Sequence, residues 1–432
     1  MHDFHYKNGE LHCEGVPLSK IAAKHGTPAY VYSHTTIRSH FQKLDQALAA
    51  LDHTICYAVK ANSNLAVLRT IAKLGGGFDV VSKGEIERVV AAGGDHNRCL
   101  FAGVGKTERE IEFALHLGIH AFNAESEPEL ERINAAAKRL KKTAPISVRV
   151  NPNVDAKTHA KITTGTYENK FGIAFEQVKK VYAKAAKMSH LQIKGVQMHI
   201  GSQLTTAEPF EGAVKKLIPL VKDLKKRYGI KFFSIGGGLG IVYEPALESG
   251  NLTWWKKKEA ASILTPQSYA ERIVPMLEPL GLEILIEPGR FIAGNAGVLI
   301  TRVEYVKRTG KKNFTIVDAA MNDLIRPAFY DAHHDIVALT KKGDTRINTD
   351  VVGPICEAGD YFCKDRPLQK VKEGDYLALL SAGAYSFVMA SNYNSRPKPT
   401  EIMVKEKQFS IVRGRESAAE LWSQEKVPSW LK

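Results

Sequence analysis

The chain has 432 residues, of which 44% are hydrophobic and 25% are charged, and its formal net charge at pH 7 is +14. This length and this balance are typical of a globular protein with two domains, or with one large domain that carries additions. No run of 18 or more uncharged apolar residues occurs, so the sequence predicts no transmembrane helix and no membrane partner. The N-terminal segment lacks a basic start followed by an apolar stretch, and we expect no secretory signal.

The excess of positive charge raises the question of a nucleic-acid partner. The lysines, however, are scattered over short segments such as "KRLKKT" and "TWWKKKE", mostly where the outer faces of helices are expected. No basic stripe alternates with aromatic residues in a nucleic-acid motif. We therefore interpret the charge as solvated surface and predict no nucleic-acid partner, although such a field would also attract an acidic small substrate.

The five cysteines are odd in number and show no C-x-x-C spacing. This pattern argues against a disulfide framework and against a zinc ribbon, and it suits the reducing cytoplasm. The sequence therefore predicts a cytoplasmic protein with free thiols.

Eight short β-type runs follow one another along the first two thirds of the chain. They span residues 54–59, 77–82, 98–103, 120–125, 146–151, 195–200, 231–236 and 282–287. Apolar residues recur at three- and four-residue spacing in segments between them, as in "LAVLRTIAKLG" and "EREIEFALHLG". Eight strands joined by helical crossovers predict an α/β fold, the parallel (β/α)8 TIM barrel, with an open doubly wound sheet as the alternative. Two connections, 152–194 and 237–281, are too long for plain helices, and such loops usually serve function.

The sequence pattern changes after residue 290. Alternating β-type runs separated by Gly-, Asp- and Lys-rich turns occupy residues 297–310, 312–321, 346–356, 375–386 and 400–414. They predict a C-terminal antiparallel β domain, which a short β-type run in the first 30 residues would join. We therefore predict a barrel over residues 30–287 and a β-sandwich or barrel-like domain over residues 1–29 and 288–432. Residues 416–430 read as a short helix and a tail.

Polar residues follow several predicted barrel strands at their carboxyl ends, where barrels carry active sites. Lys60 follows the first strand, Asp79 and Ser82 the second, His199 the sixth and Glu287 the eighth. A lysine at a strand end commonly extends its ammonium group to solvent, and a histidine there commonly has only a structural role. Whether Lys60 and His199 have a functional role therefore depends on the residues at the other strand ends.

A glycine-rich turn, "GGGLG", follows the seventh strand. Its glycines are Gly236, Gly237, Gly238 and Gly240. Backbone N–H groups of such a turn can approach a phosphate, and barrels often bind phosphate after strands seven and eight, although glycine runs also serve tight turns.

A phosphate site, a lysine and a carboxylate at neighbouring strand ends together suggest pyridoxal 5′-phosphate. Lys60, if desolvated beside cations, would lose its proton more easily and form a Schiff base with the aldehyde. Glu287 would pair with the pyridinium nitrogen, so that the ring can accept electrons. His199 would lie against the ring face.

Six motifs carry a family resemblance. In chain order they are "YAVKAN", "HIGSQ", "GGGLG", "EPGR", "GPICEAGD" and "AGAYS". In order and spacing they resemble the motifs of the fold-type III pyridoxal-phosphate-dependent decarboxylases, whose barrel is similar to that of alanine racemase. The resemblance extends from about residue 30 to about residue 405, and "MNDLIRPAFYDAHHDI" favours the branch that acts on diaminopimelate.

This resemblance implies a reaction and an assembly. The chain would decarboxylate meso-2,6-diaminopimelate to L-lysine and carbon dioxide, the last step of lysine biosynthesis. It would do so as a homodimer whose active sites are shared between the subunits.

The resemblance also implies a role for each site residue. Lys60 would anchor the cofactor, His199 would stack on its ring, and Cys356 of one subunit would protonate the carbanion in the partner's site. The candidate cofactor-binding residues are Lys60, Asp79, Ser82, His199, Gly236, Gly237, Gly238, Gly240, Glu287, Gly289, Arg290 and Tyr385. The candidate substrate-binding residues are Arg290, Arg326, Tyr330, Glu357 and Tyr385. Arginine and tyrosine would grip the distal carboxylate of the substrate, and Glu357 would accept its distal ammonium.

Two other functions stay open on the sequence. An ornithine, arginine or carboxynorspermidine decarboxylase would use the same chemistry, but Arg326 and Tyr330 favour a substrate with a distal carboxylate. A non-catalytic barrel protein that regulates an enzyme would be expected to lose Lys60 and Cys356. The segment "DAHHD" (331–335) superficially resembles a metal site, but adjacent histidines on a loop point in different directions, and we predict no metal.

Overall fold

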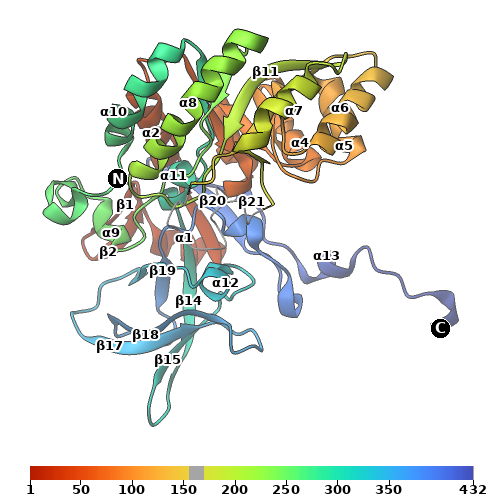
Figure 1. The fold of residues 1–432 in the computed structure, drawn as a ribbon. Coiled ribbons are helices and arrows are strands. Elements are labelled where there is room, and N and C mark those ends of the chain that lie inside the picture. Colours follow the sequence, from red (N-terminus) through yellow and green to blue (C-terminus); the bar gives the residue numbers. More distant parts are fainter. Residues whose placement is uncertain (155–169, 432) are drawn as a thin grey trace. The chain divides into compact units, whose positions relative to one another are not determined.

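The computed structural model of the chain describes residues 1–154 and 170–431 (Figure 1). Two compact units divide the chain. The first, here called the barrel unit, comprises Ile37–Ile241 and Lys257–Ile292; the second, the β unit, comprises Met1–Thr36, Val242–Lys256 and Ala293–Lys432. The folding domains predicted at residues 30–287 and at 1–29 with 288–432 stay a prediction.

Eight strands of the described residues form a parallel barrel in the barrel unit. They are β5 (His53–Ala58), β6 (Gly77–Val80), β7 (Cys99–Phe101), β8 (Ala121–Ala124), β9 (Ala144–Asn151), β11 (Leu191–Met198), β12 (Phe232–Ser234) and β13 (Glu283–Ile286). Each pairs in parallel with the next, and β13 pairs with β5, with Ile284 opposite His53. This last pairing closes the sheet, so the predicted (β/α)8 barrel is confirmed and the open sheet is excluded. A two-residue strand, β10 (Ile173–Ala174), pairs with the end of β9.

The barrel strands are buried almost throughout, as strands covered on both faces must be. Every residue of β6, β7, β8 and β12 is buried. Inside the barrel, an apolar cluster joins side chains from five strands: Cys56, Leu100, Ala121, Phe232 and Leu285. Close-packed apolar side chains of the strands therefore limit the movement of the polar residues at the strand ends.

A helix, α2 (His34–Ala47), precedes the first barrel strand, and further helices connect the barrel strands. The connecting helices are α3 (Leu65–Lys73), α4 (Lys83–Ala91), α5 (Glu108–Leu117), α6 (Glu127–Arg139), α7 (Val178–Ala185), α8 (Glu208–Tyr228) and α10 (Pro266–Leu277). Side chains that accept a backbone hydrogen bond begin several of them, including Asn64, Thr107 and Ser126. Gly118 ends α5 in the left-handed conformation that the sequence pattern indicates.

The β unit contains a large sheet. Its strands, in the order of the sheet, are β18 (Tyr361–Gln369), β17 (Arg346–Val352), β15 (Asn313–Val317), β14 (Gly297–Arg308), β4 (Ala29–Ser33), β20 (Thr400–Lys405) and β21 (Gln408–Arg413). β19 (Tyr376–Leu379) pairs with β14 and with β16 (Ile336–Ala338). The predicted β-rich C-terminal part is confirmed, but the sheet is mixed, because β15 pairs with β17 and β4 pairs with β20 in parallel.

Segments from the start of the chain complete the β unit. β1 (Phe4–Lys7), β2 (Glu10–Cys13) and β3 (Val16–Pro17) form a small antiparallel sheet beside α1 (Leu18–His25). The unit also includes three short helices: α9 (Ala246–Ser249), α12 (Arg326–Tyr330) and α13 (Ala418–Trp422). No helix in the described ranges has the length and apolar composition needed to cross a membrane.

Two of the predicted connections can now be compared with the structure. The connection 237–281 contributes residues 242–256, with α9, to the β unit and the rest to the barrel unit. Of the connection 152–194, residues 155–169 lie outside the described residues. Its later part forms β10 and α7.

Candidate active site

Lys60 lies just beyond the first barrel strand. β5 ends at Ala58, and a one-turn 3-10 helix, Val59–Ala61, carries the lysine. Its ammonium forms an ion pair with the Asp79 carboxylate at the end of β6. The Lys60 side chain is 41% exposed, whereas that of Asp79 is 1% exposed. The structure thus differs from the expected desolvated lysine beside cations, because a buried carboxylate pairs with the ammonium.

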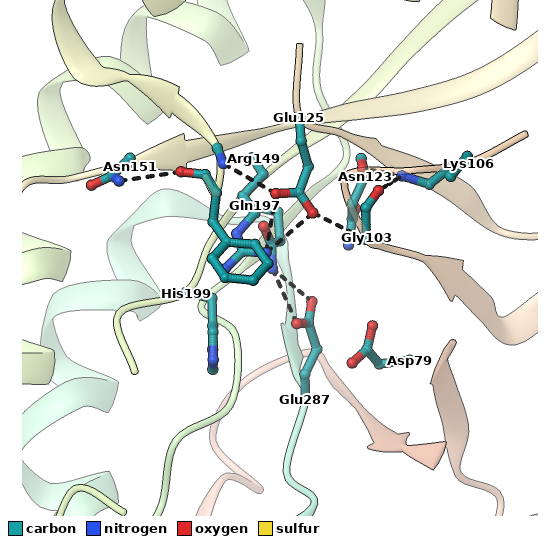
Figure 2. Close-up of polar contacts among 12 residues, drawn as sticks. Asp79, Gly103, Lys106, Asn123, Glu125, Arg149, Asn151, Gln197, His199 and Glu287 are labelled. Carbon is teal, nitrogen blue, oxygen red and sulfur yellow. Dashed lines mark hydrogen bonds and ion pairs between the residues drawn. The ribbon is translucent and has the colours of Figure 1, made fainter. Parts of the chain in front are cut away.

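Glu287 follows β13 and is buried at 6% exposure. Ser234 Oγ donates a hydrogen bond of 2.6 Å to its Oε1. Gln197 Nε2 donates one of 3.1 Å to its Oε2 (Figure 2). Burial raises the pKa of Glu287 to about 7, and the negative charge of Asp79 acts in the same direction. The carboxyl group is therefore poised to change its charge near neutral pH.

His199 follows β11, at the end of the sixth barrel strand. Its Nδ1 accepts a hydrogen bond of 3.2 Å from the Gly237 N–H, which leaves the ring proton of the neutral form on Nε2. Desolvation lowers the pKa of His199 well below its usual value, and the positive charges of Arg149 and Lys60 lower it further. The imidazole is therefore uncharged at neutral pH.

A buried ion pair that the sequence analysis missed lies at the ends of β8 and β9. Arg149 Nη1 approaches the Glu125 carboxylate oxygens at 3.1 and 3.2 Å (Figure 2). Glu125 also accepts hydrogen bonds of 3.0 Å from the Gly103 and Gly172 N–H groups. The guanidinium carbon lies 4.7 Å from the centre of the Phe171 ring. The sequence signal for this ion pair was Arg149, a charged residue inside the predicted buried strand "ISVRVN".

The glycine-rich turn packs closely against neighbouring backbone. A Cβ on Gly237 would lie 2.1 Å from the Glu287 carbonyl oxygen, and Gly238 has φ +115°. The N–H groups of Gly236, Gly237 and Gly240 donate to Ser234 Oγ, His199 Nδ1 and the Leu204 carbonyl. Among the contacts of the described residues, the Gly238 N–H has no partner. The turn is thus required by the fold, and one of its four N–H groups is available to a ligand.

The other candidates in the barrel unit have structural contacts of their own. Ser82 is the N-cap of α4, where its Oγ accepts a hydrogen bond of 3.2 Å from the Glu85 N–H. The Gly289 carbonyl accepts a hydrogen bond of 3.2 Å from the Ile292 N–H. Arg290 is 6% exposed, and its Nη2 donates a hydrogen bond of 3.1 Å to Ser202 Oγ. Arg290 begins α11 (Arg290–Ala293).

Arg326 lies in the β unit at the start of α12 and is also 6% exposed. Its guanidinium carbon lies 5.1 Å from the centre of the Tyr243 ring, and its Nε donates a hydrogen bond of 3.4 Å to His334 Nε2. The other ring nitrogen of His334 donates a bond of 2.8 Å to the Leu380 carbonyl, so Nε2 is the acceptor. Tyr243 and His334 thus orient the arginine, a role that the sequence pattern did not reveal.

The two histidines of "DAHHD" have different partners, as the sequence analysis expected. His334 contacts Arg326, whereas His333 Nε2 lies 2.8 Å from the Asp335 carboxylate. No group of three metal-ligating side chains comes together within the described ranges.

Two candidate tyrosines lie in the β unit. Tyr330 ends α12, and its ring meets the Phe329 ring edge-on at 4.7 Å. Tyr385 has φ 55°, a left-handed conformation that costs about 1–3 kcal/mol for a residue with a side chain. Such conformations cluster at functional sites, which is consistent with the role predicted for Tyr385.

Cys356 and Glu357 are exposed on a loop after β17. The Cys356 N–H donates a hydrogen bond of 3.0 Å to Asn394 Oδ1, and the Glu357 side chain is hydrogen-bonded to Tyr393. The buried Asp360 carboxylate accepts a hydrogen bond of 2.7 Å from the Ile355 N–H and so holds the base of the loop. The sequence analysis missed Tyr393 and Asn394, although they follow the "AGAYS" motif closely.

Six buried side-chain polar atoms of the barrel unit have no hydrogen-bond partner in the described part of the chain, and two of these are oxygens close to Glu287. These two oxygens are Asp79 Oδ1 and Gln197 Oε1. Unsatisfied buried oxygens are rare and are expected where a ligand supplies the donors. Asp79 and Gln197 both lie beside Glu287 in Figure 2. The barrel unit thus brings together a lysine, two carboxyl groups and a neutral histidine with polar atoms left for a ligand.

Comparisons with known proteins agree with this arrangement. Residues 34–294 match a family model described as the pyridoxal-binding domain of pyridoxal-dependent decarboxylases. The chain is 49% identical to diaminopimelate decarboxylase of Vibrio cholerae serotype O1, over 98% of this chain and 99% of the relative.

Solved structures extend the comparison. Diaminopimelate decarboxylase from Helicobacter pylori, complexed with L-lysine, is 40% identical with a TM-score of 0.87 and covers 94% of this chain and 99% of its own. The enzyme from M. jannaschii, also in complex with L-lysine, is 35% identical with a TM-score of 0.91, and each chain is covered over 100% of its length. The chain therefore belongs to the pyridoxal-dependent decarboxylases and, within them, to the diaminopimelate decarboxylase family.

Proposed function

We propose that the chain is an enzyme that uses pyridoxal 5′-phosphate to decarboxylate meso-2,6-diaminopimelate to L-lysine, the last step of lysine biosynthesis. The observation that carries this proposal is the set of Lys60, Asp79, His199 and Glu287 at the carboxyl ends of the barrel strands. Relatives that share nearly the whole chain are named diaminopimelate decarboxylase, and solved relatives contain L-lysine.

The residues of the barrel unit fit the cofactor. Lys60 supplies the amine that anchors it, and Glu287 supplies the partner of its ring nitrogen. The free N–H of Gly238 suits a phosphate oxygen, and the unsatisfied oxygen of Asp79 suits a positively charged or N–H donor. Tyr385 and the backbone at Gly289 and Arg290 complete the proposed phosphate contacts, while Ser82 acts through the position of α4.

The chemistry divides between the cofactor and the chain. When bound, pyridoxal phosphate withdraws the electron pair that carbon dioxide leaves behind. Glu287 holds a negative charge at the ring nitrogen, and the uncharged His199 covers the ring without adding a positive charge that would compete. Asp79 holds the Lys60 amine at the strand end until the cofactor engages it.

Substrate selection rests on the distal end of diaminopimelate. Arg290, Arg326 and Tyr330 bind the distal carboxylate, since guanidinium groups match carboxylates in two parallel hydrogen bonds. Glu357 accepts the distal ammonium, and Tyr385 contacts both substrate and cofactor. The guanidinium of Arg326 is buried and is oriented by Tyr243 and His334, which supports this assignment.

The proton donor completes the proposal. Cys356 would supply the proton to the carbon that carbon dioxide leaves, and it would do so in the site of the partner subunit of a homodimer. In a single chain Cys356 and Glu357 are exposed, which is consistent with a surface that meets another subunit. The enzyme acts in the cytoplasm, since each of its five cysteines carries a free thiol.

Release of carbon dioxide tests the function. The purified protein with added pyridoxal phosphate is incubated with carboxyl-labelled meso-diaminopimelate, ornithine, arginine or carboxynorspermidine. We expect labelled carbon dioxide and an equal amount of L-lysine from diaminopimelate alone. Release from ornithine or arginine at a comparable kcat/KM would replace the substrate assignment. Cofactor binding without release from any amino acid would favour the non-catalytic alternative.

A further inference from the structure

Ser234 and Gln197 donate hydrogen bonds to Glu287, and neither side chain has a direct role in the proposed reaction. Ser234 ends β12 and Gln197 lies near the end of β11, and the two are paired in register across these strands. Ser234 Oγ donates to Glu287 Oε1 at 2.6 Å, and Gln197 Nε2 lies 3.1 Å from Oε2 and 3.4 Å from Oε1. Side chains of two neighbouring strands therefore donate to both oxygens of the carboxylate, and Figure 2 shows the contacts of Gln197.

The direction of these hydrogen bonds is determined by the geometry. The Gly236 N–H donates to Ser234 Oγ at 3.3 Å, so the serine proton is left for the carboxylate. Ser234 is 0% exposed and Gln197 is 1% exposed, and water cannot replace either donor without rearrangement of the barrel. Two donors in fixed positions favour a carboxylate, which accepts hydrogen bonds only, over a carboxylic acid, which must donate one.

The surroundings of Glu287 otherwise oppose its charge. Burial raises its pKa to about 7, and Asp79 at the end of β6 acts in the same direction. The positive charge of Lys60 and the hydrogen bonds from Ser234 and Gln197 lower the pKa of Glu287. The buried thiol of Cys56 on β5 is a further titratable neighbour, and its pKa is raised well above its usual value by burial and by Glu287 itself.

We propose that Ser234 and Gln197 are positioning residues, which aim the Glu287 carboxylate and hold it in its charged form for the ring nitrogen of the cofactor. This inference rests on the proposed function, because only a cofactor with a protonated ring nitrogen requires that charge. When either donor is removed, burial and the negative charge of Asp79 still raise the pKa of Glu287. The carboxylate then binds a proton at a higher pH.

A titration of the cofactor-free protein tests the charge directly. Infrared difference spectroscopy follows the carbonyl band of the protonated Glu287, and the band is assigned by its loss in Glu287→Gln. A hydrogen bond to a charged group contributes enough that Ser234→Ala is expected to move the midpoint upward by about 1–2 pH units. Gln197→Met is expected to move it in the same direction. An unchanged midpoint in both variants would overturn the proposal.

The chain offers matched controls. Ser147 on β9 is equally buried and donates its hydroxyl proton to Asn123, away from Glu287, so Ser147→Ala should leave the midpoint unchanged. Ser234→Thr keeps the hydroxyl and should leave the midpoint close to that of the wild type. If Ser147→Ala moves the midpoint as far as Ser234→Ala, loss of packing explains the effect and the proposal is wrong.

Binding and kinetics give a second readout. In Ser234→Ala we expect the dissociation constant for pyridoxal phosphate to rise several-fold and kcat to fall, while KM for diaminopimelate stays the same. A raised KM with unchanged kcat would contradict a role at the ring nitrogen. The infrared titration needs neither cofactor nor substrate. Failure of the substrate assignment therefore leaves the shift intact, whereas failure of this inference leaves carbon dioxide release intact.

Discussion

The candidate residues of the barrel unit and those of the β unit differ in how they are held. Glu287 and His199 lie at strand ends in a buried network, and each accepts hydrogen bonds from fixed donors. Cys356 and Glu357 lie on an exposed loop, where the Cys356 N–H donates a hydrogen bond to Asn394 Oδ1 and the Glu357 side chain is hydrogen-bonded to Tyr393. The protein thus controls charge where the fold excludes water, and it presents the proposed proton donor, Cys356, from a surface.

This difference has a physical reason. A carboxyl group whose charge must be determined by the protein needs a low-dielectric site, because water would screen its neighbours. A thiol that acts after a bond has broken needs only to reach the reacting carbon at the right moment. An exposed thiol gains a desolvated environment when another surface covers it, and in the proposed dimer that surface would belong to the second subunit. Mutations in the two units test this difference.

The largest effect is expected in the barrel unit. Lys60→Ala removes the anchoring amine, and we expect the absorbance band of the bound cofactor and the activity to fall below detection. Borohydride reduction followed by peptide mapping should place the pyridoxyl group on Lys60 of the wild-type chain. Lys83→Ala, on the exposed face of α4, is the control and should retain both. Label on another lysine would show that the anchor lies elsewhere.

Loss of the proton donor in the β unit should be the next largest effect. Cys356→Ala is expected to lower kcat by about 10²–10⁴-fold, the usual contribution of a positioned acid, with cofactor absorbance unchanged. A variant that also loses the cofactor would contradict a role confined to proton transfer.

Mixed dimers sharpen this prediction. Lys60→Ala chains keep Cys356, and Cys356→Ala chains keep Lys60, so a heterodimer with shared sites contains one intact site. Random exchange makes half the dimers mixed, each with one good site of two, and about a quarter of wild-type activity should return. Each variant alone should stay far below this level. Verified exchange without recovery would show that the site forms within one chain.

Arg326 tests whether a buried group of the β unit selects the substrate. Arg326→Ala removes a guanidinium that pairs with a buried carboxylate, a loss of about 2–5 kcal/mol. We expect kcat/KM for diaminopimelate to fall roughly 30-fold or more, at tenfold per 1.4 kcal/mol, with little change in cofactor binding. Arg302→Ala, an exposed arginine paired with Glu304, should have no effect. Loss of the cofactor in Arg326→Ala would make the arginine structural.

The smallest effect is expected at Asn394, which holds the Cys356 loop by a single hydrogen bond. Asn394→Ala removes about 0.5–1.5 kcal/mol of interaction, which corresponds to a fall in kcat of roughly 2–10-fold with KM unchanged. Asn97→Ala, at an exposed turn of the barrel unit, is the control. An unchanged kcat in Asn394→Ala would mean that the loop is held by Asp360 and Tyr393 without it.

Several features of the site could be predicted from residue order alone. The first predicted barrel strand indicated Lys60, and the segment "LEILIEPGR" indicated Glu287. Apolar strands and the polar residues that follow them are local patterns of the sequence. The structure confirms that Lys60, Asp79, His199 and Glu287 lie at the ends of barrel strands. The oriented partners Ser234, Gln197, Tyr243 and His334 carry no such local signal, since each acts on a residue far away in the sequence.

The alternation of strands and helices determined the parallel barrel, because short apolar runs and helical repeats reflect burial near each residue in the chain. The tertiary structure alone decided which segments pair across long distances. β4, close in sequence to the first barrel strand, pairs with β14 and β20, and the hydroxyls of Tyr30 and Tyr32 donate to the Asp323 carbonyl and the Glu401 carboxylate. It also decided the charge state of Glu287, because burial and the fields of neighbours on other strands exist only in the folded chain.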